Sequence, residues 1–314
     1  MEQIVAGLAR LDPTSSDAVD MVRMALKLKA CPGFVVAAAA KAVATHAMSD
    51  AVPELVAAFD ALYMAKRDPG CSGRLAIVIA LHALDHWAAE VFVRGLTLVQ
   101  LEGDPNNRYD HGAAVRGACA QAHVHLLRAD ALDVCAELLA DPWAPARIGA
   151  ACGLGQSGRI DATATLRFKL ALGPDDSDVM AACFDGLFAL RRDPAIAFSV
   201  SMLRHADDRA EAAALALGSQ RAAEATDALI AWCAGATRAS RHRAGYLALA
   251  LLRSDAANAA LATVIRTGAA DDALAAGEAL ATFKHEPAVH ALLLACAKVA
   301  TDEQLRAALE RLAS

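Results

Sequence analysis

DPWAPARIGAACGLG, residues 141–155, is the stretch of sequence whose features recur along the chain. It opens with prolines, which favour the first turn of a helix and interrupt a helix interior. It continues with one basic residue, Arg147, and then with the small pair Ala150-Ala151, which suits a helix packed closely against its neighbours. The stretch therefore predicts a helix that starts after a proline turn and presents small residues to adjacent helices.

The small pair returns four more times at nearly constant spacing. The steps between successive pairs are 31, 31, 32 and 31 residues, and a charged residue stands three positions before each pair. A fixed period of this length is the signature of a repeat architecture, in which each unit packs on its neighbours. The pairs are Ala150-Ala151, Ala181-Ala182, Ala212-Ala213, Ala244-Gly245 and Ala275-Ala276.

Each interval contains two amphipathic helical patterns separated by a short break, and the breaks carry Asp-Pro, Gly-Pro or Glu-Pro. The sequence thus predicts an all-α fold, a right-handed α-solenoid of stacked antiparallel helix pairs with a period of about 31 residues. After an N-terminal region at 2–47, the predicted pairs are 51–66 with 71–87, 89–101 with 112–127, 130–140 with 143–155, 160–171 with 176–191, 195–204 with 208–217, 222–234 with 238–252, 255–267 with 269–283, and 288–299 with 302–313.

We expect a single solenoid domain over residues 1–314. Residues 1–100 form divergent helical pairs, 101–112 an inserted loop, and 113–314 a regular array closed by a C-terminal cap. The insertion is indicated by the step from Arg74 to Arg116, which is 42 residues in place of 31.

Composition narrows the function classes. The chain has 80 alanines in 314 residues, which favours helices throughout. Its formal net charge of −6 argues against a nucleic-acid-binding protein that neutralises phosphates. We expect no membrane span and no secretory signal, and eight scattered cysteines without a Cys-x-x-Cys pair indicate reduced thiols and a cytoplasmic protein.

The stretch 141–155, followed by a turn and the helical segment 162–172, resembles the bacterial HEAT-like repeat, the short type also found in phycobilin lyases. The likeness covers roughly residues 110–313. It implies stacked helix pairs and, in most members, a scaffold function; some members are enzymes, including di-iron hydroxylases and DNA glycosylases.

Three patterns suggest chemistry and have simpler structural explanations. Gly153-Leu-Gly-Gln-Ser-Gly158 spells G-x-G-x-x-G, but it follows a helical pattern in place of a strand, so we expect a helix end and a turn. His82 and His86 could face one metal ion, although no further ligands are spaced nearby, and a polar patch beside Trp87 is favoured. Each cysteine lies among Ala and Leu, which favours burial over nucleophilic catalysis.

Candidate binding residues lie in two places. The insertion carries Arg108, Tyr109 and Asp110, and a basic cluster at the start of one helix carries Arg241, His242 and Arg243. Arg and Tyr are common anchors of protein interfaces, and inserted loops often make specific contacts, although a tolerated surface excursion is equally compatible with the sequence. For the charged residues that open other helices, we expect ties between neighbouring repeats through turn carboxylates. This applies to Arg116, Arg147 and Arg209, with Asp141, Asp207 or Asp208 as acceptors.

We therefore predict a non-catalytic scaffold or adaptor that binds a protein or peptide on its concave face, formed by the second helix of each pair, without a cofactor, nucleic acid or membrane. The alternative is a HEAT-like enzyme or a chromophore- or metal-handling protein of lyase or hydroxylase type.

Overall fold

The structure is a computed structural model that describes residues 2–8, 16–27, 32–65, 67–235 and 239–314, without the side chains of 2–3, 16–19, 63–65 and 239–241. It is 76% helical, which confirms the all-α prediction. The chain divides into two compact units, Met1–Lys169 and Leu170–Ser314.

In the first unit, helices alternate along the chain between two rows. Its elements are α1 (Glu2–Leu8), α2 (Ser16–Lys27), α3 (Gly33–Thr45), α4 (Val52–Ala65), α5 (Ser72–Ala83), α6 (Ala89–Leu96), β1 (Leu101–Asp104), β2 (Asn107–Asp110), α7 (Gly112–His125), α8 (Ala131–Leu138), α9 (Ala144–Gln156) and most of α10 (Ala162–Leu172), with 3-10 turns η1 (Ser49–Ala51) and η2 (Pro69–Cys71).

The second unit continues the alternation. It contains α11 (Ser177–Leu190), α12 (Arg192–Met202), α13 (Asp208–Ser219), η3 (Ala223–Ala225), α14 (Thr226–Ala234), α15 (Ala239–Leu252), α16 (Asp255–Thr267), α17 (Ala270–Ala281), α18 (Pro287–Val299) and α19 (Glu303–Ala313).

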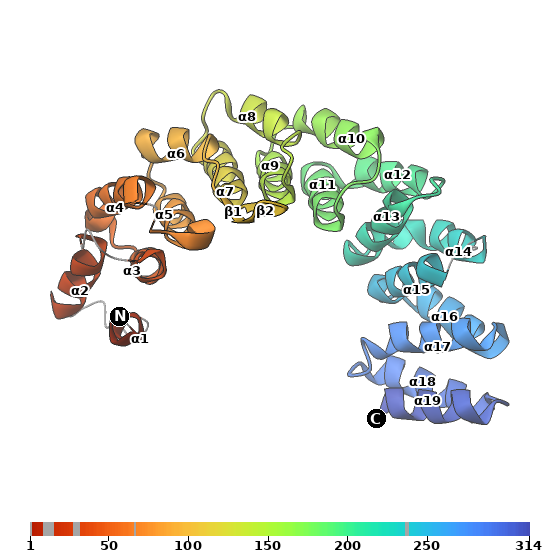
Figure 1. Cartoon of the computed structure of the whole chain (residues 1–314). Coiled ribbons are helices and arrows are strands. Elements are labelled where there is room, and N and C mark those ends of the chain that lie inside the picture. The colour runs from red at the N-terminus through yellow and green to blue at the C-terminus, as the bar shows by residue number, and fades with distance from the viewer. Residues whose placement is uncertain (1, 9–15, 28–31, 66, 236–238) are drawn as a thin grey trace. The chain divides into compact units, whose positions relative to one another are not determined.

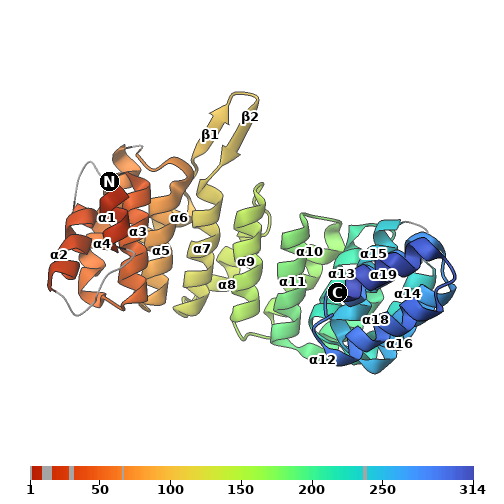
Figure 2. The same ribbon diagram turned by 90° about the horizontal axis from the view of Figure 1, so that it is seen from below.

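Every second helix packs on the helix two places further along the chain. In the first unit α3 contacts α5, α5 contacts α7, and α7 contacts α9, and Figure 2 shows these helices side by side. In the second unit α11, α13, α15, α17 and α19 follow one another in the same way. We call these helices the second-helix row of each unit; the helices between them pack against it. Helices α11, α13, α15 and α17 begin at residues 177, 208, 239 and 270, in agreement with the period read from the sequence.

The repeat predicts that both members of each small pair lie where neighbouring helices cross closely. In the structure the two members differ in burial. The second member of each pair is buried, as in Ala182 and Ala213. The first member is buried only in Ala150, and Ala181 is exposed. The helical period explains this, because adjacent residues differ in direction by about 100° and only one can face the neighbouring helix.

A left-handed residue ends most helices of the second-helix row. Ala47, Asp85, Leu127, Arg221 and Arg253 have φ between 49° and 53°, and Gly158 has φ 65° after α9. Gly153 and Gly155 lie inside α9 and are buried. The G-x-G-x-x-G sequence is therefore a helix end followed by a left-handed turn, as expected, and its first glycines belong to helix α9 and do not follow a strand.

The inserted segment is a β-hairpin and not an irregular loop. β1 and β2 pair antiparallel with Asp104 opposite Asn107, which leaves Pro105-Asn106 as the turn. Helix α6 ends at Leu96, five residues earlier than predicted, because the chain must turn out of the helix to form β1. Since α5 and α7 are in contact, the hairpin projects from an uninterrupted row of helices (Figure 2). Across the described ranges, every helix is too short or too polar to cross a bilayer.

A close backbone approach between α7 and α9 predicts a sharp response to one added methyl group. A Cβ built on Gly149 of α9 would lie 2.3 Å from the Cα of Gly117 on α7, where only backbone atoms could give way. We expect Gly149→Ala to lower the free energy of unfolding by about 1–3 kcal/mol, the usual cost of overpacking. Urea denaturation measures this; Gly235→Ala, whose added Cβ would have its nearest neighbour at 3.6 Å, is the control. Equal stability of the two variants would contradict the close crossing.

Candidate functional site: the anchored hairpin

A buried arginine holds the second strand of the hairpin to the helices. Arg116 in α7 binds Asp141 through Nε (2.8 Å) and Nη2 (3.0 Å), while its Nη1 donates to Asp110 Oδ2 (2.7 Å) and to the carbonyl of Leu98 (2.5 Å). The Arg116 and Asp110 side chains are only 6% and 2% exposed. One guanidinium thus joins the chain leaving α6, the end of β2 and the turn that precedes α9.

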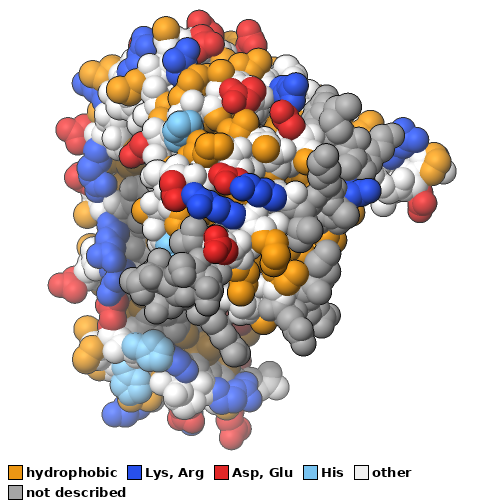
Figure 3. All heavy atoms as spheres, turned by 90° about the vertical axis from the view of Figure 1, so that its left-hand side faces the viewer, with side chains coloured by type: hydrophobic (Ala, Val, Ile, Leu, Met, Phe, Trp, Pro, Cys, Tyr) orange, Lys and Arg blue, Asp and Glu red, His pale blue; other side chains and the backbone are white. Residues whose placement is uncertain are grey.

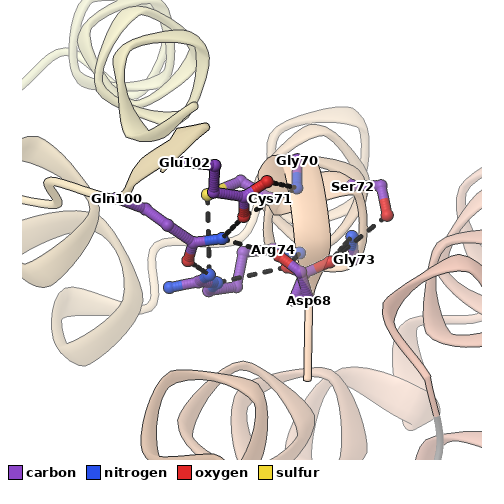
Figure 4. Close-up of polar contacts among 8 residues, drawn as sticks. All are labelled: Asp68, Gly70, Cys71, Ser72, Gly73, Arg74, Gln100 and Glu102. Atoms are coloured by element: carbon purple, nitrogen blue, oxygen red, sulfur yellow. Dashed lines mark hydrogen bonds and ion pairs between the residues drawn. The ribbon is translucent and has the colours of Figure 1, made fainter. Parts of the chain in front are cut away.

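A second buried cluster holds the first strand to the start of α5 (Figure 4). The carboxylate of Asp68 accepts hydrogen bonds from the N–H of Gly73 (2.8 Å) and from the N–H (2.9 Å) and Nε (3.2 Å) of Arg74. Glu102 of β1 accepts from the N–H of Gly70 at 3.1 Å. The Asp68 and Arg74 side chains are 0% and 3% exposed, so this ion pair is shielded from water.

Gln100 connects the two clusters. Its side-chain amide accepts from Arg74 and donates to the carbonyl of Asp68 (2.8 Å) and to Glu102 (2.5 Å), as Figure 4 shows. Its main-chain N–H donates to Asp110 (2.7 Å). The result is one chain of hydrogen bonds from the start of α5, through the hairpin base, to the turn before α9. An isolated two-stranded hairpin is marginally stable in water, so this network supplies the anchorage that the hairpin needs.

Strand β2 carries exposed side chains next to its anchored end. Arg108 lies on the surface, and Tyr109 is 43% exposed with its ring against His111 (centroids 4.9 Å apart) and Trp143 (5.0 Å). Asp110, which the sequence analysis grouped with these two as a partner contact, is instead buried. Its Oδ1 accepts from the N–H of Gly112 (2.9 Å) as well as from Gln100, so it is an anchor of the strand.

The helix-opening arginines act within the chain. The hydrogen bond from Arg116 to Asp141 confirms the predicted contact between neighbouring helix pairs. Arg147 donates instead to the carbonyls of Asp141 (2.7 Å) and Pro142 (2.8 Å) in its own turn. Arg209 pairs with Asp207 of its own turn (2.7 Å) and reaches the carbonyl of Ala171 on the preceding helix pair (3.3 Å).

The basic cluster at the start of α15 is not a uniform patch. Nδ1 of His242 lies 2.5 Å from Asp272 on α17, and its ring centroid is 5.8 Å from that of Tyr246, so this histidine joins two helices. Arg243 is exposed, and the side chain of Arg241 lies outside the described residues.

His82 and His86 do not share one helix face, because His82 lies in the last turn of α5 whereas His86 follows the end of that helix and is exposed. His82 packs on His125 of α7 (centroids 4.5 Å apart), and Nε2 of His125 lies 2.5 Å from Asp85. Burial, with the nearby His125, lowers the pKa of His82 and favours its neutral form. Within the described ranges no group of three His, Cys, Asp or Glu side chains is placed to hold a metal ion.

The described cysteines lie in the interior, except for Cys152, which is half-buried; Cys31 lies outside the described residues. Burial raises the pKa of Cys71 to about 11 and those of Cys135 and Cys233 to about 12. These thiols are protonated at neutral pH, and the predicted burial is confirmed for them. A nucleophilic cysteine typically has a lowered pKa and access to solvent.

Three members of the network, Asp68, Gln100 and Glu102, were not among the residues predicted from the sequence. A signal for the first was present: Asp68, Asp110 and Asp141 each stand six residues before an arginine, namely Arg74, Arg116 and Arg147. Gln100 and Glu102 have no such spacing, because only the folded hairpin brings them to the start of α5.

We expect removal of the Arg116 guanidinium to be costly. Arg116→Met keeps an apolar stem but leaves the buried carboxylates of Asp110 and Asp141 without their cation, which typically costs about 3–5 kcal/mol of unfolding free energy. The control is Arg209→Met, which breaks a partly exposed pair worth about 1 kcal/mol or less. Urea denaturation followed by circular dichroism compares them, and losses of equal size would contradict the network.

The network should also make stability depend on pH. Burial alone would raise the pKa of Asp110, but hydrogen bonds from Gln100, Arg116 and Gly112 outweigh it and hold the pKa below its ordinary value of 3.8. A carboxyl with a depressed folded pKa stabilises the fold above its unfolded pKa and loses that contribution as the pH falls through the folded pKa. Asp110→Asn should therefore be less stable than the wild type at pH 7, and the difference should narrow below about pH 4. If the stability difference between the two proteins did not change with pH, Asp110→Asn would act through packing alone and not through the charge of the carboxylate.

In comparisons with known proteins, no protein-family model matches the chain, and no curated protein matches it with significance.

Proposed function

We propose that the chain is a non-catalytic helical-repeat protein, a HEAT-like α-solenoid, that binds another protein or peptide. The packing within each unit supports this, since the second-helix row joins each helix to the one two places along the chain, as in repeat arrays. The 31-residue spacing of four helix starts supports it further.

The anchored hairpin is the observation that carries the binding proposal. Its base is fixed by buried hydrogen bonds, so strand β2 is held in place, and a partner loses less conformational freedom when it binds a preorganised element. Strand β2 offers Arg108 and Tyr109, and two apolar side chains at the hairpin base, Val99 (64% exposed) and Leu101 (49%), face solvent. Arg and Tyr are enriched among the hot-spot residues of protein interfaces.

Charge supports a protein partner over a nucleic acid. The face in Figure 3 intermixes basic, acidic and hydrophobic side chains in its described part, in place of a basic field. The buried carboxylates and guanidinium groups of the hairpin base are occupied by each other, which suits an anchoring role better than catalysis.

Alanine substitution of the two exposed β2 residues tests the proposal. Arg108→Ala with Tyr109→Ala should leave the helix content unchanged and cost about 1 kcal/mol of stability from the lost ring contacts. A partner captured from the source cells should then bind the purified variant at least roughly thirtyfold more weakly, the loss of about 2 kcal/mol that defines a hot spot.

The matched control is Arg159→Ala with Ile160→Ala, another exposed basic and apolar pair, in the turn before α10. It should bind as the wild type does. Unchanged affinity of the Arg108→Ala, Tyr109→Ala variant for every captured partner would refute a binding role for the hairpin.

A further inference from the structure

A groove on the second-helix row of the second unit has an apolar floor and an acidic rim. Its volume is about 540 Å³, within the usual range of binding pockets, and residues of α11, α13 and α15 line it. The floor includes Ala181, Leu215 and Leu251. The carboxylates are those of Asp175, Asp185, Asp208 and Glu211, and the described lining contains no Lys, Arg or His.

Two of these carboxylates, those of Asp185 and Asp208, are exposed, unlike the buried acidic residues at the base of the anchored hairpin. Asp185 is exposed and accepts a hydrogen bond from the neutral amide of Gln220 (3.0 Å), which leaves its negative charge in place. Asp208 is exposed in the first turn of α13. The nearby Arg209 is directed to Asp207 and Ala171. The groove therefore has a negative potential above an apolar surface.

From this complementarity we infer that the groove binds a cationic peptide segment of a partner protein, with Arg or Lys side chains at the rim and apolar side chains on the floor. A negative rim repels acidic segments and nucleic acid, and the apolar floor distinguishes a peptide with alternating side chains from a purely polar cation. The groove and the hairpin lie in different units, so this inference is independent of the proposed hairpin function.

Fluorescence anisotropy with a labelled peptide of alternating Arg and Leu, about eight residues long, tests the inference at roughly 0.1 M salt. Asp185→Asn with Asp208→Asn should weaken binding by roughly three- to tenfold, since each exposed ion pair contributes modestly. The matched control is Asp227→Asn with Asp255→Asn, which changes the same charge at two exposed aspartates of α14 and α16. This control should bind as the wild type does.

Two further measurements separate the groove from general charge attraction. A peptide of alternating Arg and Ser should bind more weakly than the Arg-Leu peptide, and one of alternating Glu and Leu should not bind. Ala181→Arg, which places a cation on the exposed floor of the groove, should reduce binding at least as much as the double aspartate variant. Circular dichroism verifies that every variant is folded.

Equal binding by the groove and control variants, equal binding of the Arg-Ser peptide, or no binding of the Arg-Leu peptide to the wild type would each overturn the inference. So would self-association of the chain that the groove variant abolishes, because a second copy would then be the occupant. Arg108→Ala with Tyr109→Ala should leave peptide binding unchanged, so a failure at the groove is distinguishable from a failure at the hairpin.

Discussion

The buried guanidinium of Arg116 is the constraint on which the first unit depends. It satisfies Asp110, Asp141 and the carbonyl of Leu98 at once, at 6% side-chain exposure. A buried ion pair adds little net stability over apolar side chains of the same size, but the loss of one member is severe. Such an interaction is better suited to specifying position than to adding stability. Here it fixes where the hairpin leaves the helical row, and with Gln100 it extends this control to the start of α5.

The rest of the architecture follows from small side chains and repeated turns. Alanine and glycine let α7 and α9 approach until their backbones touch at Gly117 and Gly149. Left-handed residues such as Leu127 and Gly158 then reverse the chain at the same point of successive pairs. Larger side chains such as Phe59, Phe92 and Phe184 fill the core away from this close crossing. Polar ties between turns and helix starts, of which Arg116 to Asp141 and His242 to Asp272 are examples, add specific contacts between successive helices.

The sequence predicts the helices well and the functional features less well. Proline turns and the spacing of small residues are local signals, so α13 and α16 begin at the predicted residues, 208 and 255. The direction of each side chain depends on the neighbouring helices, which is why Ala181 is exposed despite its place in the repeat. Arg108 and Tyr109 were found as candidates because an insertion interrupts the period, whereas the burial of Asp110 depends on a hairpin that the turn residues alone do not specify. The acidic groove was missed because Asp185 and Asp208 lie on different helices and only the fold brings them to one cavity.

Hydrogen–deuterium exchange of the wild type and Arg116→Met tests most directly whether one guanidinium holds the hairpin and the neighbouring helix starts together. We expect faster exchange in peptides covering residues 98–112 and the first turns of α7 and α9, with unchanged protection in α15 and α17 of the second unit. Unchanged exchange in the hairpin peptides, or an increase spread evenly over both units, would contradict this account.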